Sequence, residues 1–244
     1  MANQTSPLDL TFLGSGNAFG AEGRAFSSFV LNNRYLFDCG PTLLQQMRKA
    51  NIESNDIDVI LISHFHADHF FGLPFFFLDA WRNEREKELT IAGPAGIEER
   101  VDGLLKLRYS MIPGKIKFPV RYIEVSDGLE AEAAGLQFTA STVVHVPELL
   151  CYAYLGQIDG RTIVYSGDST LCDGLLRLVP GADVVVLECS CGHEPVHLAP
   201  SDVDEIKRHA SPGARVIVTH LDGHAKAGDF DDLLVAQDLA RFCL

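Results

Sequence analysis

The chain has 244 residues, 47% hydrophobic and 22% charged, an ordinary composition for a globular protein. Its formal net charge of −13 argues against a broad nucleic-acid surface, although a local basic patch is compatible with it. No apolar stretch reaches the roughly 18–20 residues that span a bilayer, and the N-terminus lacks the features of a signal peptide. We therefore expect a cytoplasmic protein with no membrane partner and with free cysteines.

Strand-like segments recur along the whole chain, and several are apolar throughout, as expected of strands that are covered on both faces. They are 8–13, 28–31, 34–39, 58–63, 89–93, 120–125, 136–144, 151–158, 161–167, 183–189 and 215–220. Helical patterns predict helices over 41–51, 94–109, 172–179, 201–210 and 229–241. Pro41 occupies a first-turn position, and Ser201 with Asp204 predicts a capping box.

The order of these elements predicts the fold class. The strands form two groups, 8–63 and 118–220, with helices interspersed. Two sheets with helices on their outer faces accommodate this order. We therefore expect a layered α/β sandwich that occupies residues 1–244 as a single domain.

The segment VILISHFHADHFFGLPFFFL, residues 59–78, places His64, His66, Asp68 and His69 inside an apolar run. Burying these groups is costly unless something satisfies them. Imidazole and carboxylate are the side chains that bind first-row divalent ions. For one histidine, a hydrogen-bonded polar group at a strand end is the better explanation. Four such side chains within six residues favour a metal site instead.

Further ligands are expected at other strand ends, because one loop cannot surround two metal ions. His145 follows FTASTVV, Asp168 follows TIVYSG, and His220 ends RVIVTH. Each residue alone is equally well explained by a structural role. Their shared position directly after an apolar strand favours a common site.

These motifs resemble the metallo-β-lactamase superfamily and, within it, the tRNase Z-like phosphodiesterase branch. The resemblance extends over nearly the whole chain. It rests on the ordered motifs LTFLGSGNAF, YLFDCGPTLLQQMRKANI, ISHFHADHFFGLPFFF, IAGPAGIEERV, YSGDST, VVVLECS and VIVTHL. It implies a four-layer αββα sandwich with two divalent metal ions at one edge, zinc or alternatively manganese.

The resemblance also implies a distribution of the ligands. One ion would be held by His64, His66 and His145, the other by Asp68, His69 and His220, and Asp168 would bridge both, opposite a bridging hydroxide. Such a pair lowers the pKa of the water between the ions and holds both oxygens of an in-line displacement. Asp68 would in addition orient the nucleophile.

A Glu–His pair is the further feature that the resemblance implies. In tRNase Z-like enzymes a Glu in an H-E-A-T motif supports a His that protonates the leaving group. Here Glu188 in LECS matches the Glu, Leu187 replaces the family's first His, and His197 in HLAPSD matches the proton donor. The interval between the two motifs is short, and a helix-entry role for His197 is the alternative.

The segment between His145 and Asp168 bears on the substrate. Its 22 residues predict two strands joined by Asp159 and Gly160, a β-hairpin with no room for the arm that binds tRNA in the family's tRNA processors. We therefore expect a small or nucleotide-like phosphodiester, with extended tRNA binding and tRNA 3′-processing disfavoured. The alternatives are a lactone, thioester or sulfate-ester hydrolase with the same metal site, and a metal-binding protein without turnover. The oligomeric state stays open, although relatives are often dimers.

Overall fold

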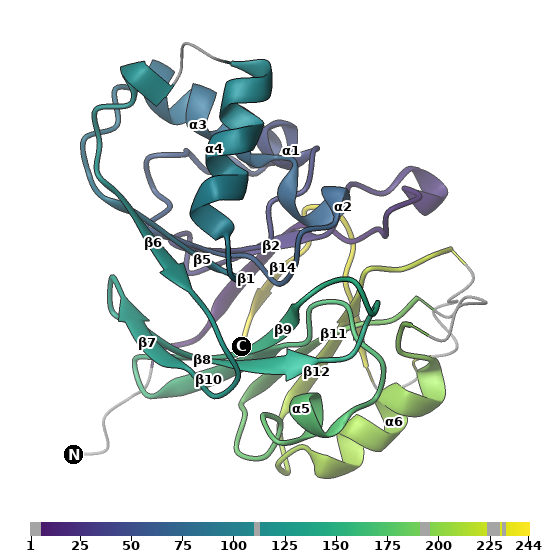
Figure 1. Ribbon diagram of the computed structural model, residues 1–244. Helices are drawn as coiled ribbons and strands as arrows, with labels where there is room; N and C mark the ends of the chain where they lie inside the picture. The colour runs from purple at the N-terminus through teal and green to yellow at the C-terminus, as the bar shows by residue number, and fades with distance from the viewer. Residues whose placement is uncertain (1–5, 110–112, 191–195, 224–229, 231–232) are drawn as a thin grey trace.

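Two seven-stranded sheets lie face to face, and helices cover their outer faces (Figure 1). The computed structural model describes residues 6–109, 113–190, 196–223, 230 and 233–244. Within these residues no helix is long and apolar enough to cross a membrane, and the cysteines form no disulfide. The four layers confirm the predicted αββα sandwich.

The first sheet has the strand order β14-β1-β2-β3-β4-β5-β6. Its strands are β1 (Asp9–Gly14), β2 (Ser28–Leu31), β3 (Tyr35–Phe37), β4 (Val59–Leu61), β5 (Leu89–Gly93), β6 (Val120–Glu124) and β14 (Arg241–Cys243). The strands from β3 to β6 are parallel. The helices on this side are α1 (Leu43–Ala50), α2 (Ala67–Phe70), α3 (Leu73–Arg82) and α4 (Ile97–Arg108), with the short η1 (Ala21–Gly23) and η2 (Pro113–Lys115).

The second sheet has the order β13-β12-β11-β10-β9-β8-β7. Its strands are β7 (Glu130–Ala133), β8 (Leu136–Val143), β9 (Cys151–Ile158), β10 (Arg161–Tyr165), β11 (Val184–Glu188), β12 (Arg215–Thr219) and β13 (Leu234–Val235). The strands from β10 to β13 are parallel. Helices α5 (Asp173–Leu176) and α6 (Pro200–His209) lie on the outer face of this sheet (Figure 1).

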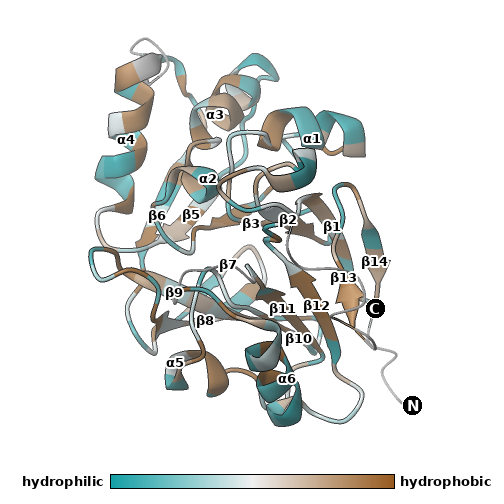
Figure 2. Ribbon diagram, turned by 90° about the vertical axis from the view of Figure 1, so that its right-hand side faces the viewer, coloured by the Kyte–Doolittle hydropathy of each residue, from teal (hydrophilic) through white to brown (hydrophobic). Residues whose placement is uncertain are grey.

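Aromatic side chains fill the space between the sheets. Phe29 and Phe37 stack with their ring centroids 4.5 Å apart, and Tyr165 from the second sheet contacts both rings edge-on. Each buried aromatic ring of this kind stabilises the fold by about 1.5–3 kcal/mol. Figure 2 shows the hydrophobic residues concentrated in the strands and hydrophilic residues on the outer sides of α1 and α6.

The predicted helix over 229–241 is wrong, although residues 229, 231 and 232 lie outside the described part of the chain. In its place β13 pairs with β12, and β14 begins at Arg241. Leu234 and Ala236 pack in the core between the sheets, whereas Leu233 and Val235 pack against the outer helical layer. This alternation has the period of two that a strand requires, and sheet pairing therefore overrides the helical pattern.

Three other expectations differ in detail. Helix α3 was not predicted, although Leu73, Phe76, Phe77 and Ala80 are buried at helical spacing. The capping contact of α6 lies earlier than Ser201, because Asp202 Oδ2 accepts the backbone N–H of Ala199 at 2.9 Å. Strand β6, grouped by sequence with the second set of strands, pairs with β5 in the first sheet.

The hairpin predicted between His145 and Asp168 is present. Strands β9 and β10 pair antiparallel, with Ile158 opposite Arg161. Asp159 and Gly160 form the turn between them, with φ of 51° and 76°. Positive φ at both central residues is the type I′ geometry that Asp-Gly favours. A two-residue turn leaves no inserted arm at the tip of this hairpin.

Candidate metal centre

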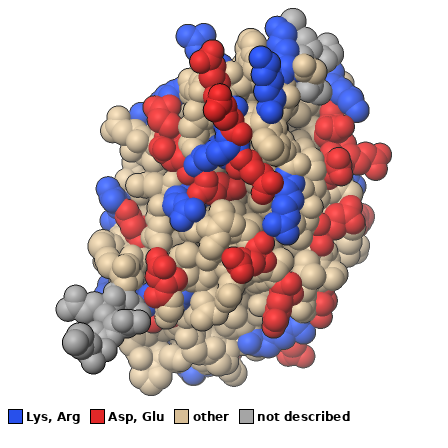
Figure 3. Space-filling model, turned by 90° about the vertical axis from the view of Figure 1, so that its left-hand side faces the viewer, with Lys and Arg blue, Asp and Glu red and all other residues tan. Residues whose placement is uncertain are grey.

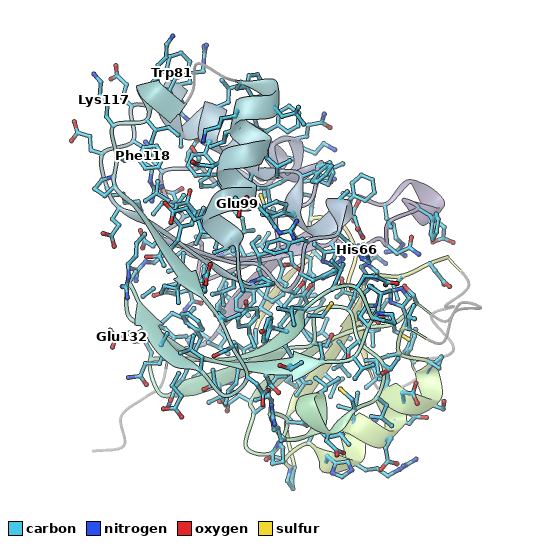
Figure 4. All side chains as sticks on the ribbon, viewed as in Figure 1. His66, Trp81, Glu99, Lys117, Phe118 and Glu132 are labelled. Atoms are coloured by element: carbon cyan, nitrogen blue, oxygen red, sulfur yellow. The ribbon has the colours of Figure 1, made fainter. Side chains whose placement is uncertain are left out.

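The candidate ligands meet at one edge of the sandwich, where the strand ends of both sheets face each other. His64 and His66 follow β4, and α2 carries Asp68 and His69. Three further candidates follow strands of the second sheet: His145 comes after β8, Asp168 after β10, and His220 after β12. Figure 4 shows His66 between the two sheets, close to α2.

Within this edge the side chains form two overlapping groups. In each group, one ligand atom per residue lies within 4.8 Å of the others. The groups are His64, His66, His145 and Asp168, and Asp68, His69, Asp168 and His220. The Asp168 carboxylate therefore lies between two clusters, each with the nitrogen and oxygen ligands that a divalent ion takes.

Tight packing against the loop after β3 fixes the position of α2. The backbone N–H of Cys39 donates to the His69 carbonyl at 2.7 Å, and the Gly72 N–H donates to the Cys39 carbonyl at 2.7 Å. An ideal Cβ on Gly40 would lie 2.4 Å from the Asp68 carbonyl oxygen. Glycine is therefore required here for the backbones to approach each other.

Asp38 is a fully buried carboxylate behind this loop, and sequence reasoning did not identify it. It accepts hydrogen bonds from Ser63 N at 2.7 Å, from Ser63 Oγ at 2.8 Å, and from Tyr165 Oη at 2.6 Å. It also lies 2.7 Å from His69 Nδ1, which donates to it. Because the Nδ1 proton is held in this way, the lone pair of His69 Nε2 faces the centre.

Similar contacts fix the tautomers of the other histidines. Ser63 Oγ gives its proton to Asp38 and so accepts from His64 Nδ1 at 3.0 Å. His145 Nδ1 donates to the Val196 carbonyl at 2.8 Å. Ser190 Oγ donates to the His220 carbonyl and lies 3.1 Å from His220 Nδ1, from which it accepts. The Nε2 atoms of these rings are therefore left as acceptors.

The ring nitrogens of these histidines and of His66 converge. His66 Nδ1 lies 3.0 Å from His64 Nε2 and 3.3 Å from His145 Nε2. His69 Nε2 lies 3.2 Å from His220 Nε2. Asp168 Oδ1 is buried and has no hydrogen-bond partner among the described residues. Lone pairs that face one another repel unless a cation lies between them, and the donor set therefore fits divalent metal ions.

The pKa values of the Asp168 and Asp68 carboxyls are lowered by neighbouring positive charge. Burial raises the pKa of Asp168, but the charges of His220 and His69 outweigh burial and hold it well below its usual range. Burial likewise raises the pKa of Asp68, and the charge of His69 with hydrogen bonds from His220 and His69 outweighs it. Burial lowers the pKa of His69, but the charges of Asp168, Asp68 and Asp38 outweigh burial and raise it, so that without metal a proton on Nε2 supplies positive charge to the centre. A bound divalent ion would take the place of that proton and supply the same charge to the two buried carboxylates.

Glu188 and His197 lie together at the border of the centre. Glu188 Oε1 accepts from His197 Nδ1 at 2.8 Å, from Leu198 N at 3.1 Å, and from Ser169 N at 3.2 Å. Its Oε2 accepts from Ser190 N at 3.0 Å. Four donors therefore fix the carboxylate, and the carboxylate in turn fixes the orientation of the His197 ring.

His197 is held protonated by this arrangement. Burial lowers its pKa, but the hydrogen bond to Glu188 and the charges of Glu188 and Asp168 outweigh burial and raise the pKa to about 9. The ring lies with its Nδ1 3.9 Å from Asp168 Oδ2, and the side chain is 18% exposed. Nε2 therefore carries a proton beside the candidate metal centre, the requirement for a general acid.

A family model described as Anti-Pycsar protein Apyc1 matches residues 8–226, which is most of the chain. The chain belongs to this family. Among curated relatives, ribonuclease Z of Methanosarcina mazei is 26% identical over 300 aligned positions that cover 95% of this chain and 96% of the relative. The alignment is longer than the 244-residue chain, so the relative carries segments that this member of the family lacks.

Solved structures show the same fold. The metallo-β-lactamase fold protein YhfI from Bacillus subtilis has a TM-score of 0.77 at 21% identity and covers 97% of this chain and 99% of its own. A diphosphatase from the PhnP family has a TM-score of 0.73 at 20% identity, with the same coverage of 97% and 99%. The metallo-β-lactamase fold and the tRNase Z-like resemblance are therefore confirmed.

All nine site residues named from the sequence lie in one contiguous cluster. Glu188 and His197 form a group with His220, which connects them to the candidate metal ligands. Sequence reasoning missed the residues behind them, Asp38, Ser63, Tyr165 and Ser190. The only indication of Asp38 was an acidic side chain at the end of the apolar strand YLFD.

Proposed function

We propose that this protein is a phosphodiesterase that uses two divalent metal ions, zinc or alternatively manganese, to hydrolyse a small or nucleotide-like phosphodiester. Its family, its fold and its ribonuclease-named relatives make it a metal-dependent hydrolase. The observation that carries the finer proposal is the 2.8 Å hydrogen bond that holds His197 on Glu188, next to two clusters of metal-ligand atoms.

The ligands divide between the two ions as the two clusters do. His64, His66 and His145 would hold one ion, Asp68, His69 and His220 the other, and Asp168 would contact both. When bound, such a pair activates water for attack and neutralises negative charge on the phosphate. Asp68 has a second carboxylate oxygen with which it can orient that water.

His197 supplies what phosphodiester cleavage needs in addition. An alkoxide leaving group is a strong base, and its departure is favoured when a proton reaches it in the transition state. The Nε2 proton of His197 is available for this transfer because Nδ1 is engaged by Glu188. Lactone and thioester hydrolysis depend less on such a donor, which favours the phosphodiester.

Two observations support a small substrate. The tip of the β9–β10 hairpin is the two-residue turn Asp159–Gly160, with no arm. The formal net charge of −13 disfavours a broad basic surface for a nucleic-acid backbone, and the face shown in Figure 3, which lies away from the metal centre, carries acidic and basic side chains interspersed. We therefore place precursor tRNA behind small phosphodiesters as a substrate.

A hydrolysis panel tests this proposal. Zinc-loaded protein is assayed with bis-p-nitrophenyl phosphate, a cyclic nucleotide, a precursor tRNA, a homoserine lactone and an acyl thioester. We expect turnover of at least one of the small phosphodiesters, with the lactone and thioester hydrolysed at least about 100-fold more slowly, since they gain little from the His197 proton. Preferred turnover of the lactone or thioester would refute the proposal, and efficient cleavage of the tRNA would refute its substrate size.

A further inference from the structure

A cavity away from the metal centre lies in the helical layer that covers the first sheet. It has a volume of about 680 Å³ and lies between the end of α3 and the segment from η2 to β6. Its lining residues are Trp81, Arg82, Glu84, Arg85, Glu86, Lys115, Lys117 and Phe118. Figure 4 shows Trp81, Lys117 and Phe118 near one another and well separated from His66. The volume is in the range of small-molecule sites.

The cavity is positively charged on an acidic protein. Four of its lining residues are basic and two are acidic, whereas the whole chain carries a net charge of −13. Arg82, Lys115 and Lys117 are exposed and form no ion pair with any described residue, in contrast to Arg48 and Lys87 nearby in the chain. Their charges are therefore free to meet an anion.

Arg85 adds a buried cation to the wall of this cavity. The residue is 3% exposed, and its guanidinium lies 5.4 Å from the centroid of the Phe118 ring. Its hydrogen-bond acceptors are the uncharged carbonyl oxygens of Ser54, Ile57, Lys87 and Glu88. No carboxylate among the described residues forms an ion pair with it. Burial lowers the pKa of Arg85 to about 10, although the nearby charge of Asp58 opposes this shift.

Trp81 provides an organic surface beside these charges. Its side chain is 37% exposed, and Lys115 Nζ lies 4.9 Å from the centroid of its ring. An aromatic face with neighbouring ammonium and guanidinium groups suits a ligand that combines a phosphate with an apolar or planar part. Nothing in the proposed phosphodiesterase mechanism uses these residues.

We propose that this cavity binds a small organic phosphate. Arg82, Lys115 and Lys117 contact the phosphate, the organic part lies against Trp81, and the bound anion adds negative charge near the buried Arg85. The cavity is a binding site distinct from the metal centre and independent of its chemistry.

The fluorescence of Trp81 provides a direct measurement, since it is the one tryptophan in the chain. The metal-loaded protein is titrated with adenosine 5′-monophosphate, ribose 5-phosphate and adenosine at constant ionic strength. We expect a saturable change with both phosphates, weakened by added salt, and a response to adenosine at least about tenfold weaker, because only the phosphates make charge-assisted hydrogen bonds. Equal responses to adenosine and to its phosphate would overturn the proposal.

Two sets of variants locate the binding. The double substitution Lys115→Gln with Lys117→Gln is expected to weaken phosphate binding about tenfold or more, because each lost contact is a charge-assisted hydrogen bond. Its control, Lys49→Gln with Lys207→Gln, changes the net charge equally on α1 and α6 and is expected to bind as the wild type. Asp168→Ala is expected to leave the response unchanged. No saturable response in the wild type, equal weakening in both double variants, or loss of the response in Asp168→Ala would each refute this site.

Discussion

Asp168→Ala is expected to abolish metal binding and turnover together. Asp168 is the residue common to both clusters of ligand atoms, and its removal takes an ionised carboxylate from between them. We expect the variant to lose most of its bound metal and to hydrolyse bis-p-nitrophenyl phosphate on the order of 10³-fold more slowly, because metal-ion activation of water is lost. Elemental analysis by mass spectrometry and the steady-state rate measure the two effects.

The matched control is Asp204→Ala, which removes an exposed carboxylate on α6. It is expected to keep wild-type metal content and activity. An Asp168→Ala protein that folds, retains its metal and hydrolyses the diester at the wild-type rate would show that Asp168 is not a ligand.

His197→Ala is expected to retain the metal and to slow hydrolysis according to the leaving group. Its imidazole donates to Glu188 and makes no hydrogen bond to the candidate metal ligands. Diesters with an alkyl leaving group are expected to react about 10²–10⁴-fold more slowly, whereas p-nitrophenyl diesters, which need no proton donor, change little. Rates for a matched pair of such substrates measure the difference. Equal slowing of both would remove His197 from the role of general acid.

The same residue sets the pH dependence for substrates with poor leaving groups. The acid form of His197 is the active one, and its pKa is raised to about 9. Activity is therefore present below this pH and is lost as the pH rises through about 9. Glu188→Gln removes the largest interaction that raises this pKa, so the decline is expected at lower pH in that variant.

The clustering of the candidate ligands could be predicted from sequence because their pattern is local. Four candidate ligands lie within six residues, and the other three each follow an apolar strand. Parallel strands bring their carboxyl ends to one edge, so residues that are distant in the chain share a site. The αββα layers could be predicted for a similar reason, from the alternation of strand and helix patterns.

The features that could not be predicted depend on contacts between distant segments. Asp38 is recognised as important only when Ser63 and Tyr165, from two other strand ends, are seen to donate to it. The helix expected over 229–241 fails because β12 and β1 provide partners for strands there. The cavity at Trp81 joins residues 81–86 to residues 115–118, and neither segment alone indicates a site.

The most direct measurement is the rate of bis-p-nitrophenyl phosphate hydrolysis by chelator-treated protein as zinc or manganese is returned to it. We expect no hydrolysis by the metal-free protein and full recovery at about two equivalents of metal per chain, the number that two ligand clusters sharing one carboxylate would hold. A metal-free preparation, verified by elemental analysis, that hydrolyses the diester at the full rate would contradict the proposed mechanism.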